Sequence, residues 1–273
     1  MPTAVLFPGQ ASQTPGMRDD VAAIRPDLLD LAIDVVGDDP FARVDEDTRF
    51  AQPAIFCASL AGWTDLQQRL GAPPAAMAGH SLGELSALAA AGAIGERDAL
   101  ELVALRGRLM SACDEGTMLA ALGGDQHEVE GIAHRHGVTV ANDNAPGQLV
   151  LSGSRDGIAL AATDLRSAGV RVMELNVAGA FHSPLMASAL PEFEAALAKV
   201  RFRPATVTVW SCVTARPVDD PRRRLAEGLV RPVRWRQTIL GLHGEGVDAF
   251  EETGPGRILT KMLRRILPEV ARV

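Results

Sequence analysis

The sequence predicts an α/β protein in which a smaller unit is inserted into a larger one, and two observations support this prediction. The first is the motif Gly79-His80-Ser81-Leu82-Gly83-Glu84, which follows a short apolar run and precedes a helix-forming run over residues 85–91. This is the strand–turn–helix setting in which Gly-x-Ser-x-Gly presents a serine at the end of a sheet. The second is the alternation of apolar and helical patterns between Gly116 and about Ala180, which follows the order βαββαβ.

Composition and charge limit the class of protein. The chain has 273 residues, of which 47% are hydrophobic and 22% charged, as is ordinary for a globular protein of one or two domains. A net charge of −7 argues against nucleic acid as a general partner. No apolar run reaches the roughly 20 residues of a membrane span, and the first seven residues lack the basic start of a signal peptide. The three cysteines are scattered, which favours a reduced, cytoplasmic interior.

The N-terminal part begins with a short strand and a loop. Residues 4–7 are apolar, and the loop over residues 8–13 lies where an α/β fold places ligand contacts. Gln10 is therefore a candidate binding residue, although a solvated loop glutamine fits the composition equally well. Residues 21–36 have one continuous helical pattern, and a second helix is expected to open at Gln52-Pro53.

The two glycines of the motif explain how its serine is exposed. Gly79 and Gly83 have no Cβ, so the backbone can turn sharply and a neighbouring element can pack closely. Ser81 is then left at the N-terminus of a helix, where free N–H groups and the helix dipole favour a developing oxyanion. The alternative is a glycine-rich turn with an ordinary serine, and the flanking strand and helix favour a nucleophile.

A further helix, predicted over residues 99–110, carries Arg106. Arginines are mostly exposed, so a surface position is the simpler interpretation. The functional alternative is a guanidinium that points into the site, where it would hold a carboxylate through two hydrogen bonds.

The inserted unit reads as a ferredoxin-like subdomain. Its predicted strands cover residues 118–122, 138–141, 149–153 and 170–175, and its helices cover residues 126–136 and 156–168. His127, His134 and His136 lie on or near its first helix, but their spacing matches no familiar zinc motif. A solvated helix face is the better interpretation, and we expect no metal and no bound cofactor.

The remainder of the chain returns to the larger unit. A helix up to Val200 and a strand over residues 206–210 precede the charged segment 219–224, which is expected to be an exposed turn. A helix is expected to begin at Pro232, and a basic helix to follow the Gly-Pro-Gly segment 254–256. Two basic clusters could steer an acidic partner. The first comprises Arg222, Arg223, Arg224, Arg231, Arg234 and Arg236, and the second comprises Arg257, Lys261, Arg264 and Arg265 at the last helix.

A nucleophilic serine needs a base, and two histidines compete for this role. His182 would form a Ser–His dyad, whereas His243 after Asp219 and Asp220 would complete the Ser–Asp–His order of hydrolases. His80 is a weaker third candidate, since a residue next to the nucleophile points elsewhere. The pattern leaves the choice open, but the inserted unit ends at His182, where clefts form between domains.

Seven motifs along the chain together resemble the malonyl-CoA:acyl carrier protein transacylases and the acyltransferase domains of polyketide synthases. They occur in the order of that family and span nearly the whole chain. The motifs are Phe7-Pro8-Gly9-Gln10, Gly79-His80-Ser81-Leu82-Gly83-Glu84, Leu105-Arg106-Gly107, Asn144-Ala145-Pro146-Gly147-Gln148, Gly179-Ala180-Phe181-His182-Ser183-Pro184, Pro232-Val233-Arg234-Trp235 and Gly254-Pro255-Gly256.

The resemblance implies a fold, a reaction and roles for single residues. The fold is an α/β-hydrolase-like subdomain, residues 1–115 and 183–273, with a ferredoxin-like subdomain over residues 116–182. The reaction is ping-pong transfer of a malonyl group from malonyl-CoA to the phosphopantetheine thiol of an acyl carrier protein, with no other cofactor. The implied roles are nucleophile for Ser81, base for His182, carboxylate partner for Arg106, and oxyanion donors for Gln10 and the N–H of Leu82.

The sequence also bears on substrate selectivity, and it departs from the family pattern at two positions. Leu82 and Phe181 resemble the malonyl-selective pattern, since Phe181 would crowd a branched α-carbon. The family usually has glycine where this chain has Ala11, and Gln or Asn where it has Gly228, whose carbonyl would orient the histidine. The alternatives are the carrier-charging subunit of malonate decarboxylase, an acyl-editing hydrolase and a non-catalytic scaffold. The family also suggests a monomer.

Overall fold

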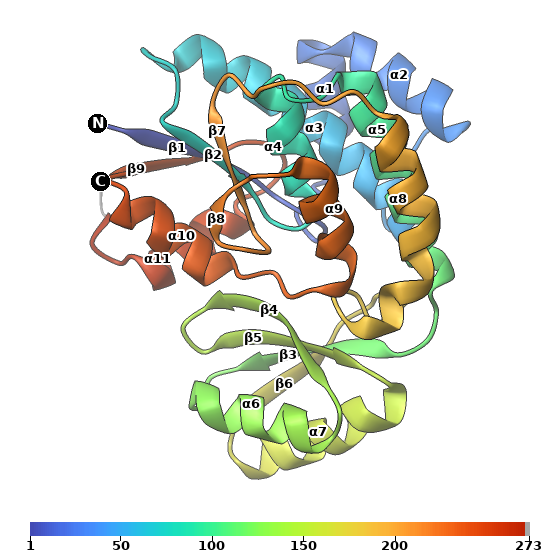
Figure 1. Ribbon diagram of the computed structural model, residues 1–273, viewed down its shortest axis with the longest axis vertical. Coiled ribbons are helices and arrows are strands. Elements are labelled where there is room, and N and C mark those ends of the chain that lie inside the picture. Colours follow the sequence, from blue (N-terminus) through green and yellow to red (C-terminus); the bar gives the residue numbers. More distant parts are fainter. Residues whose placement is uncertain (271–273) are drawn as a thin grey trace.

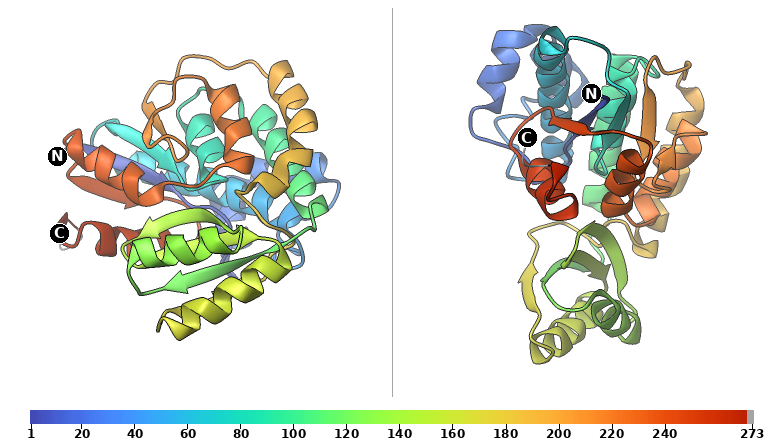
Figure 2. Two further views of the ribbon diagram at one scale, coloured as in Figure 1. Left: turned by 60° about the horizontal axis from the view of Figure 1, so that its bottom comes forward. Right: turned by 90° about the vertical axis from the view of Figure 1, so that its left-hand side faces the viewer.

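The computed structural model describes residues 1–270 and contains two sheets, each covered by helices (Figure 1). The larger sheet has the strand order β8-β7-β2-β1-β9, and the smaller has the order β4-β5-β3-β6. The smaller sheet and its two helices form a separate layer below the larger unit in Figure 1, and the right-hand view of Figure 2 shows the same separation.

The larger sheet is built around two central parallel strands, β1 (Thr3–Phe7) and β2 (Ala76–Gly79). β9 (Ala249–Glu252) pairs with β1 and β7 (Thr208–Ser211) with β2, both in parallel. The two-residue strand β8 (Arg216–Pro217) closes one edge in antiparallel fashion. All four residues of β2 are buried, as expected for a parallel strand that helices cover on both faces.

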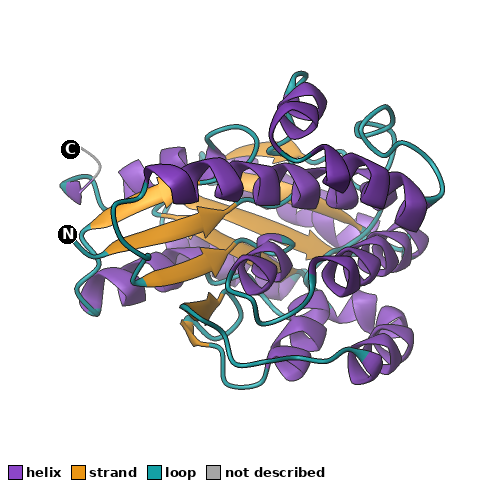
Figure 3. Ribbon diagram, turned by 90° about the horizontal axis from the view of Figure 1, so that it is seen from above, coloured by secondary structure: helices purple, strands orange, loops and turns teal. Residues whose placement is uncertain are grey.

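Helices flank this sheet on both sides (Figure 3). Within residues 1–270, nine α-helices and one 3₁₀ helix belong to the larger unit and have the following bounds: α1 Met17–Ile24, α2 Pro26–Val36, α3 Thr48–Arg69, α4 Gly83–Ala90, α5 Glu96–Ala112, η1 Pro184–Ala189, α8 Leu190–Lys199, α9 Pro221–Val230, α10 Trp235–Gly244 and α11 Ile258–Ile266. Among the residues described, no helix is both long enough and apolar enough to cross a membrane.

The smaller unit has the βαββαβ order that the sequence predicts. Its strands are β3 (Thr117–Leu122), β4 (Thr139–Ala145), β5 (Gln148–Gly153) and β6 (Arg171–Glu174), all antiparallel to their neighbours. Its helices, α6 (Gln126–Arg135) and α7 (Arg155–Ser167), cover one face around a core of their own. The domain boundaries at residues 115/116 and 182/183 remain a prediction.

Three local predictions are wrong, and a proline or a capping side chain explains each of them; a fourth helix begins three residues later than predicted. The helix predicted over 21–36 is interrupted at Arg25, because Pro26 disfavours a helical conformation in the residue before it and starts α2. α3 begins at Thr48, where the Asp47 side chain caps it, and includes Pro53 in its second turn.

The third wrong prediction is the exposed turn over residues 219–224. The Asp220 side chain accepts hydrogen bonds from the backbone N–H groups of Arg222 and Arg223, and Pro221 occupies the first helical position. Residues 221–224 are therefore the first turn of helix α9 (Pro221–Val230), and Asp219 and Asp220 precede it. The helix predicted at Pro232 begins three residues later, at Trp235.

Close backbone contacts explain the two glycines of the serine motif. A Cβ on Gly83 would lie 2.0 Å from the Phe7 carbonyl oxygen, and one on Gly79 would lie 1.9 Å from the Gly83 carbonyl carbon. Both neighbours are backbone atoms, which a side chain cannot displace cheaply. The strand end, the turn and α4 can pack together only because both positions lack a side chain.

Candidate active site

Ser81 lies in the sharp turn between β2 and α4, at the end of the larger sheet that faces the smaller unit. Its φ of +54° is rare for a residue with a side chain and shows a constrained turn. Leu82 is the N-cap residue of α4, and its backbone N–H has no acceptor within residues 1–270, whereas the N–H groups of Gly83 and Glu84 donate to backbone carbonyls. The serine hydroxyl therefore lies next to the N–H of Leu82 and the positive end of the α4 dipole.

The structure brings His182, rather than His243, to the serine. The Ser81 Oγ atom lies 2.9 Å from His182 Nε2, and His182 Nδ1 lies 2.8 Å from the carbonyl oxygen of Gly228. Since a carbonyl can only accept, Nδ1 carries the proton and the Nε2 lone pair faces the serine. The other candidates point elsewhere: His243 Nδ1 contacts the Val247 carbonyl, and His80 Nε2 contacts Asn144 Oδ1.

The Gly228 carbonyl is free because of the residue four positions later. In an α-helix this carbonyl would accept the N–H of residue 232, but Pro232 has no N–H to donate. Gly228 is in the last turn of α9, so its carbonyl is also at the negative end of the helix dipole. α9 thus supplies the acceptor that orients the imidazole and favours the imidazolium form.

Arg106, on α5, is buried beside the serine. Its guanidinium donates to Ser81 Oγ at 3.0 Å and to Gln52 Oε1 at 2.7 Å, and the residue is only 5% exposed. It makes no ion pair with any residue from 1 to 270. Burial lowers its pKa to about 10, so the guanidinium remains charged at neutral pH. A buried cation that lacks an ion-pair partner and lies beside a serine hydroxyl can bind a carboxylate.

A cavity of about 550 Å³ opens over these groups. Gln10, Leu82 and Phe181, the other predicted site residues, all line it. The amide of Gln10 exchanges hydrogen bonds with the Thr48 hydroxyl at 2.8 and 3.1 Å. The opposite wall is the uncovered face of the small sheet, and its apolar side chains are Met118, Ala120, Leu122, Val150 and Met173.

Three polar residues around the site were missed by sequence reasoning. Gln52 holds the Arg106 guanidinium, and its position before a proline had suggested only a helix start. Asn144 holds His80 and also lines the cavity. Glu84, 2% exposed, accepts hydrogen bonds from the backbone N–H of Cys212 and from the Ser211 hydroxyl. Glu84 and Asn144 belong to motifs that carry the family resemblance, but the partners of all three residues lie in distant segments, so the sequence does not show their contacts.

The structure offers no group of three His, Cys, Asp or Glu residues that could hold a metal ion within residues 1–270. His127 is exposed, as predicted for a solvated face of α6. His136, just past the helix, is instead 19% exposed in its side chain and contacts Asp164 at 2.8 Å.

A serine that an imidazole can deprotonate, beside helix N–H donors, can form and release an acyl ester. The α/β fold and this site define the class of serine acyl-transfer enzymes. Within that class, the chain belongs to the family described as "Acyl transferase domain", whose model matches residues 29–273. The predicted two-subdomain fold is confirmed by solved members of this class.

The chain is similar to proteins of known name. It is 41% identical over 98% of its length to the polyketide biosynthesis protein ThaF of Burkholderia thailandensis, although it spans only 24% of that longer protein. It is 36% identical to the polyketide biosynthesis malonyl CoA-acyl carrier protein transacylase PksC of Bacillus subtilis, covering 96% of each chain.

A crystal structure of an acyl-carrier-protein S-malonyltransferase from Burkholderia pseudomallei 1710b superposes with a TM-score of 0.92 at 34% identity. The match covers 99% of this chain and 94% of the other.

The protonation of His182 generates a first prediction. Burial, followed by the charge of Arg106, lowers its pKa to about 3. Because an imidazole is neutral above its pKa, His182 can accept the serine proton throughout the range from about pH 5 to pH 8. Labelling of Ser81 by a neutral sulfonyl fluoride should therefore change by less than about threefold over this range, as followed by intact mass. An ordinary histidine, with a pKa near about 6.5, would lose more than tenfold. A decline centred near that value, in protein shown to be folded, would contradict the assignment.

Proposed function

We propose that this protein transfers a malonyl group from malonyl-CoA to the phosphopantetheine thiol of an acyl carrier protein, through an ester on Ser81. The observation that carries the proposal is the charged Arg106 guanidinium, 3.0 Å from the nucleophile and without a carboxylate partner within residues 1–270. Relatives support it, since PksC and the transacylase of Escherichia coli, each 36% identical to this chain, are named malonyl CoA-acyl carrier protein transacylases.

The proposed chemistry uses the dyad twice. Ser81 Oγ attacks the thioester carbonyl while its proton passes to His182 Nε2. The C–S bond then breaks, and the imidazolium returns the proton to the departing thiolate of coenzyme A. In the second half, His182 takes the proton of the carrier's thiol, the sulfur attacks the malonyl ester, and Ser81 leaves with the proton.

The tetrahedral intermediates require donors for their oxyanion. We assign this role to the N–H of Leu82 and the Gln10 side chain, because both belong to loops at the edge of the cavity. The Gln10 amide is held by Thr48, which limits its rotation. Phe181, 5% exposed, and Leu82 would restrict the space for a branched α-carbon, and we assign malonyl selectivity to them. We also expect a monomeric, cytoplasmic enzyme.

The first test of this function is acylation itself. After brief mixing with malonyl-CoA, intact mass should show one malonyl adduct on the native protein and none on Ser81→Ala. His182→Ala should slow both acylation and transfer by roughly a hundredfold or more. His243→Ala serves as the matched control and should be nearly silent, because this histidine bonds the Val247 carbonyl away from the serine. An adduct that persists on Ser81→Ala, or reversed behaviour of the two histidines, would contradict the assignment.

The second test concerns Arg106. Breaking a buried ion pair by removing one partner costs on the order of 3–5 kcal/mol, so Arg106→Ala should lose malonyl transfer by a hundredfold or more. Acetyl transfer should hold or improve, since an acetyl group has no carboxylate to pair. Comparable losses of malonyl and acetyl transfer, measured side by side, would mean that Arg106 has a structural role instead.

The structure also distinguishes the two predicted basic clusters. In the first, Arg223, Arg224 and Arg231 all share the carboxylate of Glu227, so much of its charge is neutralised. In the second, the exposed Lys261 and Arg264 of α11 make no hydrogen bond or ion pair through their side chains with residues 1–270. The inner face of α11 lines the cavity. We therefore propose α11 as the surface that steers the acidic carrier protein to the cleft.

The third test is charge reversal on α11. Lys261→Glu combined with Arg264→Glu should raise the apparent KM for the carrier protein several-fold at low salt, and the difference should fade at high salt. Transfer to free pantetheine should not change, because that small thiol needs no docking surface. Arg155→Glu combined with Arg166→Glu, two exposed positions of α7, changes the net charge by the same amount and is the control. A KM that is independent of salt and of the double reversal would exclude this surface.

A further inference from the structure

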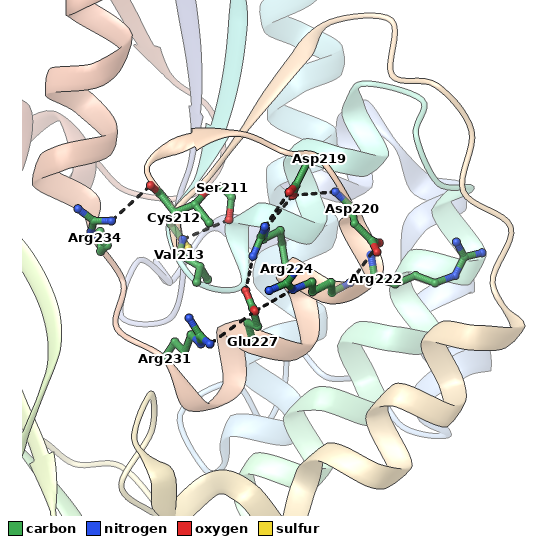
Figure 4. Close-up of polar contacts among 12 residues, drawn as sticks. Ser211, Cys212, Val213, Asp219, Asp220, Arg222, Arg224, Glu227, Arg231 and Arg234 are labelled. Atoms are coloured by element: carbon green, nitrogen blue, oxygen red, sulfur yellow. Dashed lines mark hydrogen bonds and ion pairs between the residues drawn. The ribbon is translucent and has the colours of Figure 1, made fainter.

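The residue that orients His182 belongs to a helix with an unusual arrangement of charges. Arg224, one turn before Gly228 on α9, joins two carboxylates (Figure 4). Its Nε and Nη2 atoms each donate to one oxygen of Asp219 at 2.7 Å, and its Nη1 atom donates to Glu227 Oε2 at 2.6 Å. Asp219 precedes the helix, and Glu227 is the residue directly before Gly228. One guanidinium therefore connects the start of α9 to the turn that holds the carbonyl.

This arrangement is more than an exposed pair of charges. The Arg224 and Glu227 side chains are only 12% and 14% exposed, whereas isolated exposed ion pairs contribute little. Arg224 binds Asp219 through two parallel hydrogen bonds, the geometry that fixes an orientation as well as a distance. The Arg224 guanidinium lowers the pKa of Asp219, and the Asp219 carboxylate, followed by that of Glu227, raises the pKa of Arg224. Burial would raise the pKa of Glu227, but its arginine partners outweigh this and lower it.

The helix needs such a restraint because Gly228 supplies none. A glycine has no side chain to fix the backbone around it, and it costs about 0.5–1 kcal/mol relative to alanine within a helix. Leu225 and Leu229 bury one face of α9 and hold it against the larger unit. Apolar packing of this kind tolerates small rotations, which would move the Gly228 carbonyl relative to His182 Nδ1. The imidazole follows that carbonyl, since the contact sets both its tautomer and its direction.

We propose that Arg224 is a positioning residue for the base: by joining Asp219 to Glu227 it fixes the last turn of α9, and with it the Gly228 carbonyl that orients His182. The inference rests on the proposed function only in taking His182 as the base. It differs from a docking role for the same arginine, because a docking residue would affect the carrier protein and not the reactivity of Ser81.

The test compares two arginines that contact the same carboxylate. Arg224→Gln should lower the rate of Ser81 acylation at saturating malonyl-CoA about tenfold and leave the KM for malonyl-CoA within twofold. Arg223→Gln is the matched control: Arg223 also contacts Glu227, at 3.1 Å, but from a side chain that is 63% exposed, and its loss should have less than a twofold effect. Arg224→Lys keeps the charge without the two-pronged geometry and should be intermediate.

A second readout separates this inference from the proposed function. Sulfonylation of Ser81 by a neutral sulfonyl fluoride needs the dyad but no malonyl group, so it should fall in parallel in Arg224→Gln. If malonyl-CoA fails to acylate the native protein, the proposed function fails, and the sulfonylation rates still decide the role of Arg224. Adding Gly228→Ala to Arg224→Gln should recover most of the rate, because a Cβ at residue 228 meets only Val213 at 3.7 Å and stiffens the turn.

The following outcomes would contradict the positioning role of Arg224. Equal rates for Arg224→Gln and Arg223→Gln would overturn the proposal, and so would a defect confined to transfer onto the carrier protein. Should Arg224→Gln fail to fold, Asp219→Asn replaces it. Asp219 is 62% exposed, so this variant removes the bidentate contact with little risk to the core, and about a threefold loss of the acylation rate is expected. An unchanged rate in that variant would overturn the proposal as well.

Discussion

The contact of 2.9 Å between Ser81 Oγ and His182 Nε2 joins two residues that are 101 positions apart, and the surrounding structure serves to hold it. Both residues have a positive φ, +54° and +58°, so both are held in backbone conformations that side chains rarely adopt. Each conformation must be imposed from outside. The close packing of Gly83 against β1 imposes the first. For His182, the surroundings include the buried Ser183, whose hydroxyl bonds the Ala180 carbonyl at 2.6 Å, and the α9 carbonyl that binds its ring.

The same site contains a buried charge, the Arg106 guanidinium, that lowers the stability of the fold. Arg106 is desolvated, and its hydrogen-bond acceptors within residues 1–270 are neutral oxygens. Glu84 is the carboxylate whose charge counters it, and burial in turn raises the pKa of Glu84. Two buried and incompletely compensated ions cost stability, which is characteristic of sites organised for a ligand. A substrate that brings its own carboxylate would compensate the guanidinium. The Arg106 side chain would then account both for selectivity toward a substrate with a carboxylate and for the free energy of its binding.

The sequence predicts the fold well where the signals are local and less well where they are not. The Gly-x-Ser-x-Gly turn and the βαββαβ order follow from spacing and from alternation of apolar residues, and the structure has both. The misread segments depend on where a helix begins: Pro26 interrupts the helix predicted over residues 21–36, and the Asp220 side chain caps α9 within segment 219–224. There Asp220 followed by Pro221 is a helix-start signal that the cluster of charges concealed. The contacts of Gln52, Asn144 and Glu84 could not be predicted, because their partners lie at least 54 residues away.

The two departures from the family pattern, Ala11 and Gly228, differ in what the backbone conformation requires at each position. Ala11 has a φ of +75°, a conformation that glycine adopts without strain and that costs an alanine about 1–2 kcal/mol. Gly228 has an ordinary helical backbone and room for a methyl group, so nothing in its conformation requires glycine. The chain thus has alanine where the backbone favours glycine, and glycine where it would accept alanine. Neither exchange removes a group that the chemistry uses, because the carbonyl of residue 228 and the Gln10 amide remain. In both cases neighbouring side chains restrain the group instead. The Thr48 hydroxyl holds the Gln10 amide, and the charged side chains along α9 restrain the backbone around Gly228.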